Sequence, residues 1–128
     1  MAKKRKPKFS EESYGRYTHW EKGSRELPKI LEFTNKIIAE EGNEFGIILN
    51  VENGKGALVD FCIKHPPIKD EKGKLMPDFT GQLHIPANTY QIFVGDSVWA
   101  PIDDKIGEWR VIISFEGKTI ADRKFVVR

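Results

Sequence analysis

The residues of this chain that could bind a metal ion are three histidines and the carboxylates near them in sequence. Imidazole nitrogens and carboxylate oxygens are common ligands of zinc and similar metals. None of the histidines has a recognisable ligand spacing such as His-x-x-x-His, and a histidine before Pro66-Pro67 more simply bonds a backbone group of a loop. The sequence therefore predicts no metal site. The candidates set aside by this prediction are His19, His65, His84, Asp60, Asp70 and Asp78.

No serine or cysteine stands in a pattern typical of a catalytic nucleophile. No serine occupies a Gly-x-Ser-x-Gly turn, and Cys62, within an apolar run, is interpreted as a small packed side chain. No glycine-rich phosphate-binding loop is found, since the stretches GDSVW and ENGKG lack its Gly-Lys-Ser/Thr ending. We therefore expect no catalytic residue, no cofactor and no enzymatic activity. The acids expected only to face water or to form turns are Glu40, Glu41, Asp70, Asp103 and Asp104.

The first ten residues are strongly basic. They hold five of the 21 lysines and arginines and no acid, whereas the rest of the chain carries a small excess of acids. Such a segment could hold an anionic partner such as RNA by contacts that do not read sequence. The alternative is a solvated, disordered leader. The residues predicted to contact nucleic acid or another anion are Lys3, Lys4, Arg5, Lys6 and Lys8.

Aromatic residues follow this leader at spacings of three. Tyr14, Tyr17 and Trp20 lie near further cations, and aromatic rings beside cations can stack on the bases of single-stranded nucleic acid. Packing of these rings against the body of the protein is the alternative that we favour. Residues 1–26 show no sustained hydrophobic period, so we interpret them as a basic N-terminal arm outside the core.

Beyond residue 27, apolar and polar residues alternate with a period of two, as in strands with one buried face. In the clearest case Phe45, Ile47, Leu49 and Val51 share one face. Residues 65–86 contain four prolines and are expected to form a loop with at most one edge strand. The expected strands lie near residues 30–40 (interrupted near Asn35), 44–51, 57–64, 81–85, 90–94, 108–115 and 118–127.

Two turn signals join these segments. Asn53-Gly54 lies between apolar runs and predicts a hairpin, because both residues tolerate positive φ. Glu116-Gly117 predicts a second hairpin near the C-terminus. Ile120 does not share the parity of Phe125 and Val127, so it faces the same core only if a bulge or twist intervenes, and otherwise covers an outer face.

These elements predict an all-β protein with an antiparallel sandwich over residues 27–128, preceded by the arm of residues 1–26. The 128 residues suffice for one core. No apolar run approaches the roughly 20 residues of a membrane helix, the basic start lacks the apolar region of a signal peptide, and one cysteine excludes an intrachain disulfide. We expect a cytoplasmic protein that does not contact membranes.

The stretches EEGNEFGIILNV, IKHPPIKDEKGK and GEWRVIISFEGKTIADRKFVV follow one another along the chain. Together they resemble a bacterial domain-of-unknown-function family with an immunoglobulin-like β-sandwich. The likeness covers roughly residues 27–128. It implies an immunoglobulin-like antiparallel sandwich of about seven strands, but it implies neither an activity nor site residues, since fold alone does not determine function.

We therefore expect a non-enzymatic protein-interaction module. Its partner is an unknown protein, or a second copy of the chain, held through an edge strand or a sheet face. One alternative is a nucleic-acid-associated protein that binds through its Lys/Arg-rich arm. A further alternative is a hydrolase with a metal in the long loop, which requires His65 and His84 to lie within coordination reach of one ion.

Overall fold

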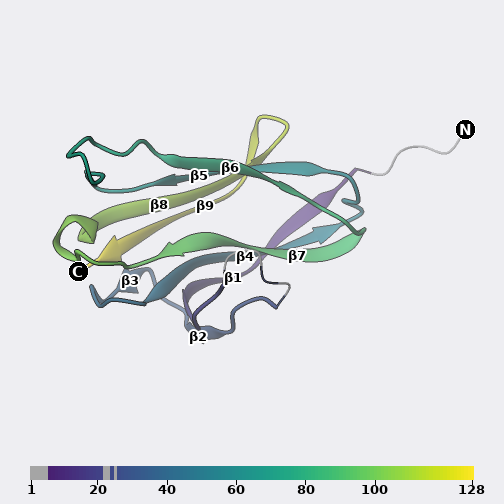
Figure 1. Cartoon of the computed structure of the whole chain (residues 1–128). Coiled ribbons are helices and arrows are strands. Elements are labelled where there is room, and N and C mark those ends of the chain that lie inside the picture. Colours follow the sequence, from purple (N-terminus) through teal and green to yellow (C-terminus); the bar gives the residue numbers. More distant parts are fainter. Residues whose placement is uncertain (1–5, 22–23, 25) are drawn as a thin grey trace, which may run out of the picture.

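The computed structural model describes residues 6–21, 24 and 26–128, and these residues form two β-sheets packed face to face (Figure 1). Sheet A has the strand order β2-β1-β4-β7, and sheet B has the order β3-β9-β8-β5-β6. All neighbouring strands are antiparallel except β3 and β9, which are parallel. The elements are β1 (Lys8–Tyr17), β2 (Ile30–Glu32), β3 (Lys36–Ile37), β4 (Glu44–Glu52), β5 (Leu58–Lys64), β6 (Phe79–His84), β7 (Thr89–Ser97), the 3-10 helix η1 (Asp103–Lys105), β8 (Gly107–Phe115) and β9 (Lys118–Val127).

Strand β1 corrects the expectation that residues 1–26 form an arm outside the domain. It lies inside sheet A, between β2 and β4, and pairs with β4 along its whole length. The sequence pattern hides this strand because polar and charged residues occupy most of its positions and because a bulge between Glu11 and Ser13 shifts its parity. The sandwich therefore begins well before residue 27.

The predicted alternation of β4 is confirmed, and it builds the main core. Phe45, Ile47, Leu49 and Val51 are each no more than 1% exposed and face sheet B. The ring of Phe45 meets Trp109 edge-on at a centroid distance of 5.3 Å and also contacts Phe125. Burial of each such side chain contributes about 1.5–3 kcal/mol, so these contacts hold the two sheets together.

The two turn signals have different outcomes. Glu116-Gly117, with φ angles of 50° and 80°, closes the predicted hairpin between β8 and β9. The hairpin predicted at Asn53-Gly54 is wrong, because β4 belongs to sheet A and β5 to sheet B. Asn53 does adopt a positive φ of 57°, but the turn carries the chain across the core instead of reversing it within one sheet.

Of the two alternatives left open for Ile120, a bulge or a place on an outer face, the structure contains the bulge. The β8–β9 register shifts between Ile113, which faces Ala121, and Ser114, which faces Thr119. Ile120 is the extra residue, and it packs against the main core. The bulge alternative is therefore confirmed.

One long side of the sandwich, the closed side, is sealed where β1 lies over β9. The Arg123 guanidinium donates from Nε and Nη2 to the two carboxylate oxygens of Glu11 at 2.8 and 2.6 Å, and it lies 4.0 Å from the ring centroid of Tyr14. The rings of Phe9 and Phe115 meet at 5.1 Å. These contacts join the sheets at this side, and the chain also crosses from β2 to β3 here.

Candidate functional site

A groove opens on the opposite long side, the open side, where β7 and β6 are the edge strands of the two sheets. Its volume is about 970 Å³. One wall consists of apolar side chains from sheet B, including Phe61, Phe79 and Leu83, and the other comes from the segment after β1, with Trp20 and Leu27. The groove therefore follows the unpaired edge of β7, between two apolar walls.

The backbone of β7 presents to this groove hydrogen-bonding groups that no described strand pairs with. The Val98 N–H donates to the Asn43 carbonyl, and the β4–β7 register continues from this pair without a shift. Because peptide groups of an antiparallel strand point alternately toward and away from a neighbour, those of Gln91, Phe93 and Gly95 point away from β4. Nothing in the described part of the chain pairs with them in a further strand.

The groove wall beside β7 rests on a second apolar cluster, which lies on the outer face of sheet A. Tyr17, Ile48 and Phe93 form it, and Trp20, Leu27 and Ile30 cover it. The ring of Phe93 lies 5.1 Å from that of Tyr17 and 5.4 Å from that of Trp20. Ile48 and Phe93 occupy the outward parity of their strands, and this was the sequence signal for a second covered surface.

Three glycines stand side by side across the three long strands of sheet A, on the face that carries this cluster. Gly15 pairs with Gly46, and Gly46 pairs with Gly95. A Cβ at Gly46 would lie 2.3 Å from the Val94 carbonyl oxygen, and one at Gly95 would lie 2.8 Å from the Phe93 ring. The row therefore keeps the strands close together and leaves room for the aromatic rings.

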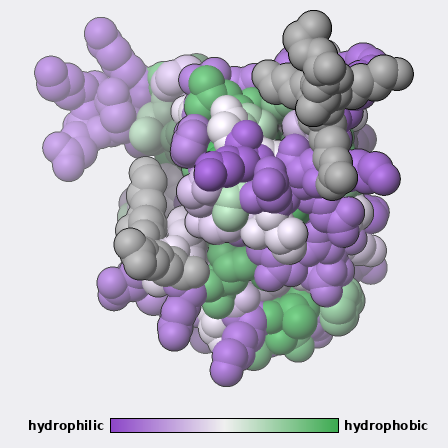
Figure 2. All heavy atoms as spheres, turned by 90° about the vertical axis from the view of Figure 1, so that its right-hand side faces the viewer, coloured by the Kyte–Doolittle hydropathy of each residue, from purple (hydrophilic) through white to green (hydrophobic). Residues whose placement is uncertain are grey.

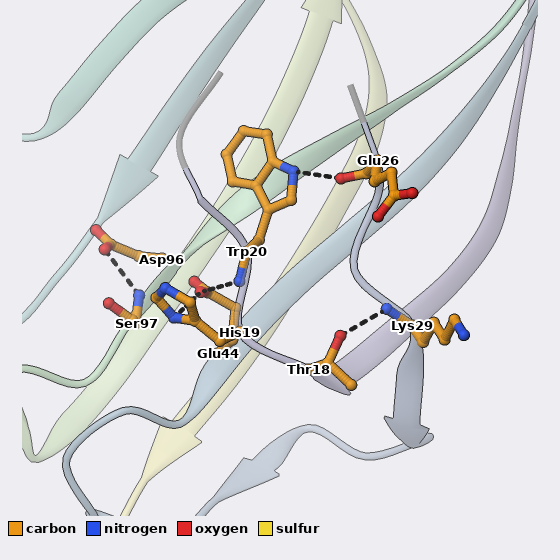
Figure 3. A network of polar contacts seen from close by, with 8 residues as sticks. All are labelled: Thr18, His19, Trp20, Glu26, Lys29, Glu44, Asp96 and Ser97. Atoms are coloured by element: carbon orange, nitrogen blue, oxygen red, sulfur yellow. Dashed lines mark hydrogen bonds and ion pairs between the residues drawn. The ribbon is translucent and has the colours of Figure 1, made fainter. Parts of the chain in front are cut away.

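A polar network anchors the segment after β1 to the first residue of β4 (Figure 3). The Trp20 N–H donates to Glu44 Oε1 at 3.1 Å, and His19 Nδ1 lies 3.7 Å from the same oxygen. Trp20 Nε1 donates to the Glu26 carbonyl, and the Lys29 N–H donates to Thr18 Oγ1. The network fixes Trp20 over Phe93 at the rim of the groove.

Glu44 is the buried carboxylate of this network, at 5% exposure. Burial raises the pKa of its carboxyl above the ordinary value, against the hydrogen bond from Trp20 and the nearby His19 imidazole, which lower it. Asp96 lies close enough to raise this pKa further. Asp96 Oδ1 also accepts a hydrogen bond from the Ser97 N–H at 2.8 Å. Negative groups therefore gather where β4 begins and β7 ends.

His65 and His84, which the metal-hydrolase alternative required to bind one ion, lie in different surroundings. His65 is packed between Phe79 and Trp109, and its Nδ1 and Nε2 lie 2.7 and 2.8 Å from the carbonyl oxygens of Pro66 and Pro77. The prediction that this ring bonds a loop backbone group is confirmed. His84 is exposed and lines the groove. Among the described residues, no group of three or more histidine, cysteine or acidic side chains could hold a metal ion.

The other candidate residues occupy structural positions. Cys62 Sγ lies 3.9 Å from Asp78 Oδ2, and burial followed by this carboxylate raises the thiol pKa, which opposes activation as a nucleophile. Asp70 Oδ1 accepts the N–H groups of Lys72 and Lys74, which confirms its predicted turn role. The remaining acids Glu40, Glu41 and Asp103 are exposed, and Asp104 pairs with Lys105.

The contact of the basic leader with nucleic acid or another anion stays a prediction. Lys3, Lys4 and Arg5 lie outside the described residues, while Lys6 and Lys8 are exposed.

The aromatic residues that follow the leader pack against the protein. Tyr17 is 2% exposed, the Arg123 guanidinium lies over the Tyr14 ring, and Trp20 rests on Phe93. The favoured prediction of packing is confirmed, and stacking of bases on Tyr17 is excluded by its burial.

A separate apolar surface lies in the segment from β2 to β3. Figure 2 shows apolar side chains at the lower end of the molecule, the level at which β2 lies in Figure 1. Leu31, Phe33 and Ile38 are 53, 68 and 67% exposed. The edge strands here have only three and two residues, whereas β7 has nine. Short edges pair poorly with other chains, so β7 is the more capable edge.

Comparisons with known proteins agree with this architecture. An immunoglobulin-like protein from Pseudomonas aeruginosa, solved by crystallography, has a TM-score of 0.81 to this chain, with 18% sequence identity, and the match covers 99% of this chain and all of that one. This likeness shows the fold, so the immunoglobulin-like sandwich is confirmed. No curated protein matches. Among the described residues, no helix is long and apolar enough to cross a membrane. A family model matches residues 5–127, and the chain therefore belongs to the family described as Domain of unknown function (DUF3859).

Proposed function

We propose that this protein is a non-enzymatic binding module that takes up an extended segment of a partner protein as an additional strand beside β7. The observation that carries the proposal is the nine-residue edge of β7, which lies unpaired along a groove of about 970 Å³. Extended peptides add to such edges in other domains, where backbone hydrogen bonds give affinity and pockets for alternate side chains give specificity.

The groove suits a strand because it has a wall on each side of the β7 edge. A strand beside β7 directs alternate side chains to opposite faces. One row faces the apolar side chains of Phe61, Phe79 and Leu83, and the other row faces Trp20 and Leu27. Each row therefore has an apolar surface to cover, and burial of apolar surface favours association.

The edge of β6 is a weaker candidate for the same role. It has six residues, and Pro77 and Pro86 lie close to its two ends. Proline lacks the N–H that a ladder needs, so it limits extension of pairing on this side. The partner strand is therefore assigned to the edge of β7, and β6 forms one wall of the groove.

A substitution that blocks only the edge tests this function. Gln91→Pro removes an N–H that points away from β4, so the β4–β7 ladder is kept while pairing with an added strand is lost. Gln91→Ala is the matched control, because it removes the same side-chain contact with Asn50 and keeps the N–H.

The binding assay uses nonamer peptides selected on the protein from a random display library, with affinity measured by fluorescence anisotropy. We expect Gln91→Ala to bind and Gln91→Pro to lose at least about tenfold in affinity, the equivalent of about 1.4 kcal/mol. Amide hydrogen exchange of Phe93 and Gly95 should slow when peptide is added. Equal binding by the two variants, or unchanged exchange, contradicts the proposal.

A further inference from the structure

We infer that the strand accepted beside β7 is cationic, an extended lysine- or arginine-bearing segment of another protein. This inference rests on the proposed function and names the chemistry of its partner. It is carried by the charges that line the groove and by their arrangement along it.

The groove lining is acidic, although the chain as a whole carries 21 basic and 19 acidic residues. Glu44, Asp78 and Asp96 line it, and the described lining residues include no lysine or arginine. The two cations of the adjoining segment, Lys22 and Arg25, lie outside the described residues. An acidic lining attracts cations, speeds their association and disfavours acidic partners.

These three carboxylates gather at one end of the groove. Glu44 pairs with Ser97 and Phe45 with Asp96, so Glu44 and Asp96 mark the end of β7. Consecutive strands β6 and β7 run in opposite directions along the groove, so Asp78, which precedes β6, lies toward the same end. The other end holds apolar residues such as Leu83 and Tyr90. A matching strand therefore combines basic residues at one end with apolar residues at the other.

At the acidic end of the groove, the carboxylates of Glu44 and Asp96 lie on different faces of sheet A. Asp96 has the parity of Ile92 and Val94 and so belongs to the row that faces sheet B, where Asp78 lies across the groove. Glu44 belongs to the outer face, with its carboxylate held by Trp20 and His19. A lysine or arginine in the row facing sheet B lies nearest to Asp78 and Asp96, and the negative charge at this end of the groove favours a cation there.

The same charges argue against a second copy of the chain at this edge. The β7 strand itself, TYQIFVGDS, carries no lysine or arginine, so a second β7 edge brings no cation to these carboxylates. We therefore commit to a different protein as the source of the strand.

Three matched peptides test the inference: TVKVKVT, TVSVSVT and TVEVEVT, each blocked at both ends. They share their length and their flanking threonine and valine residues, and they differ at the third and fifth positions, which carry a positive charge, no charge or a negative charge. We expect the lysine peptide to bind at least about tenfold tighter than the glutamate peptide, with the serine peptide between them. The difference should shrink when NaCl is raised from roughly 0.05 to 0.5 M, because salt screens exposed charges.

Charge-neutralising variants locate the effect. In Asp78→Asn/Asp96→Asn the preference for lysine over serine should fall at least about threefold. Asp122→Asn is the control, since Asp122 lies on β9 and pairs with Arg110 away from the groove. A preference that persists in the double variant, or that is lost in the control, overturns the inference.

The three peptides and Gln91→Pro together distinguish a cationic partner from strand addition itself. Equal affinity for all three peptides, with Gln91→Pro still abolishing binding, overturns the cationic partner and supports strand addition. Binding of none of them, when library-selected nonamers bind through the edge, likewise overturns the cationic partner alone. Binding that ignores Gln91→Pro overturns both. A dimer in light scattering that Gln91→Pro dissociates identifies a second copy as the occupant and overturns the inference.

Discussion

The closed and open sides of this sandwich differ in how the two sheets are joined. On the closed side, Arg123 of β9 binds Glu11 and stacks on Tyr14 of β1, and the chain itself crosses between the sheets after β2. On the open side, β7 and β6 end the sheets without such a bond among the described residues, and a groove lies between them. One long side is therefore closed by bonds between the two sheets, whereas the other leaves a groove between its edge strands.

The largest expected effect comes from Gly15→Ala on the closed side. Gly15 has a φ of +146°, and an added Cβ would lie 2.0 Å from the Glu32 carbonyl oxygen, so β2 cannot stay paired with β1. We expect the free energy of unfolding to fall by about 3–4 kcal/mol, measured by urea denaturation. In the control Gly81→Ala, the Cβ meets the movable ring end of Phe61, and the loss should be smaller. Equal losses would contradict the role given to the β1–β2 contact.

Trp20→Ala tests the wall of the open side. The indole covers Phe93 and donates to the Glu26 carbonyl, but it is only partly buried, so we expect a loss of about 2 kcal/mol in the free energy of unfolding. Peptide affinity for the β7 edge should fall as well. Trp20→Phe keeps the ring contact and should retain most of both. If Trp20→Ala lowered stability without changing peptide affinity, the wall would not belong to the binding site.

Arg123→Met tests how much the ion pair between the two sheets contributes to the free energy of unfolding. The pair with Glu11 is bidentate but partly exposed, at 41 and 23% for the two side chains, so its removal should cost about 1 kcal/mol at low salt. Peptide binding at the open side should not change. The control Arg110→Met breaks a pair with Asp122 within sheet B, and its cost should be lower. A larger loss of stability for Arg110→Met would mean that the Arg123–Glu11 pair between the sheets contributes no more than an ion pair within one sheet.

The smallest effect is the pH dependence of Glu44→Gln. Because burial raises the folded-state pKa above the ordinary 4.5, the contribution of Glu44 to stability is fully present below that value and is lost as pH rises through the folded pKa. Glu44→Gln removes this loss and should become more stable relative to the parent between about pH 4 and pH 7.

Asp122→Asn should change the pH dependence of stability in the opposite direction. Its hydrogen bond with Arg110 lowers the pKa of Asp122, so the stabilising contribution is present at neutral pH and is lost as pH falls through the folded pKa. The variant should be less stable than the parent at neutral pH and should approach it in acid. Thermal melts across this range check both variants, and parallel curves for the two would contradict the assignments.

The main core could be predicted from sequence because a period of two assigns each side chain to a face without knowledge of the partner strand. That reasoning placed Phe45 and Val51 correctly and gave a bulge near Ile120 as one of two alternatives, the one that the structure contains. It failed at Asn53, where a turn residue with positive φ reports local geometry but not which sheet receives the next strand. It also failed at β1, whose parity shifts at a bulge and whose residues are mostly polar or charged.

The groove was harder to predict than the core. It depends on which strand ends each sheet, and this is a property of topology that no local pattern reports. Ile48 and Phe93 lay on the outward parity of their strands and indicated a second covered surface. The acids Glu44 and Asp96 come together only through the β4–β7 register, so their convergence could not be read from their separation in sequence.

The position of β9 has a consequence for how this domain forms during translation. β9 supplies Phe125 and Val127 to the core and holds both β8 and β3, and the Arg128 N–H donates to the Ile37 carbonyl. Sheet B therefore stays incomplete on the ribosome until residue 127 has left the exit tunnel. Until then the nascent polypeptide exposes apolar surface and unpaired strands, which is the period in which chaperones would protect it from aggregation.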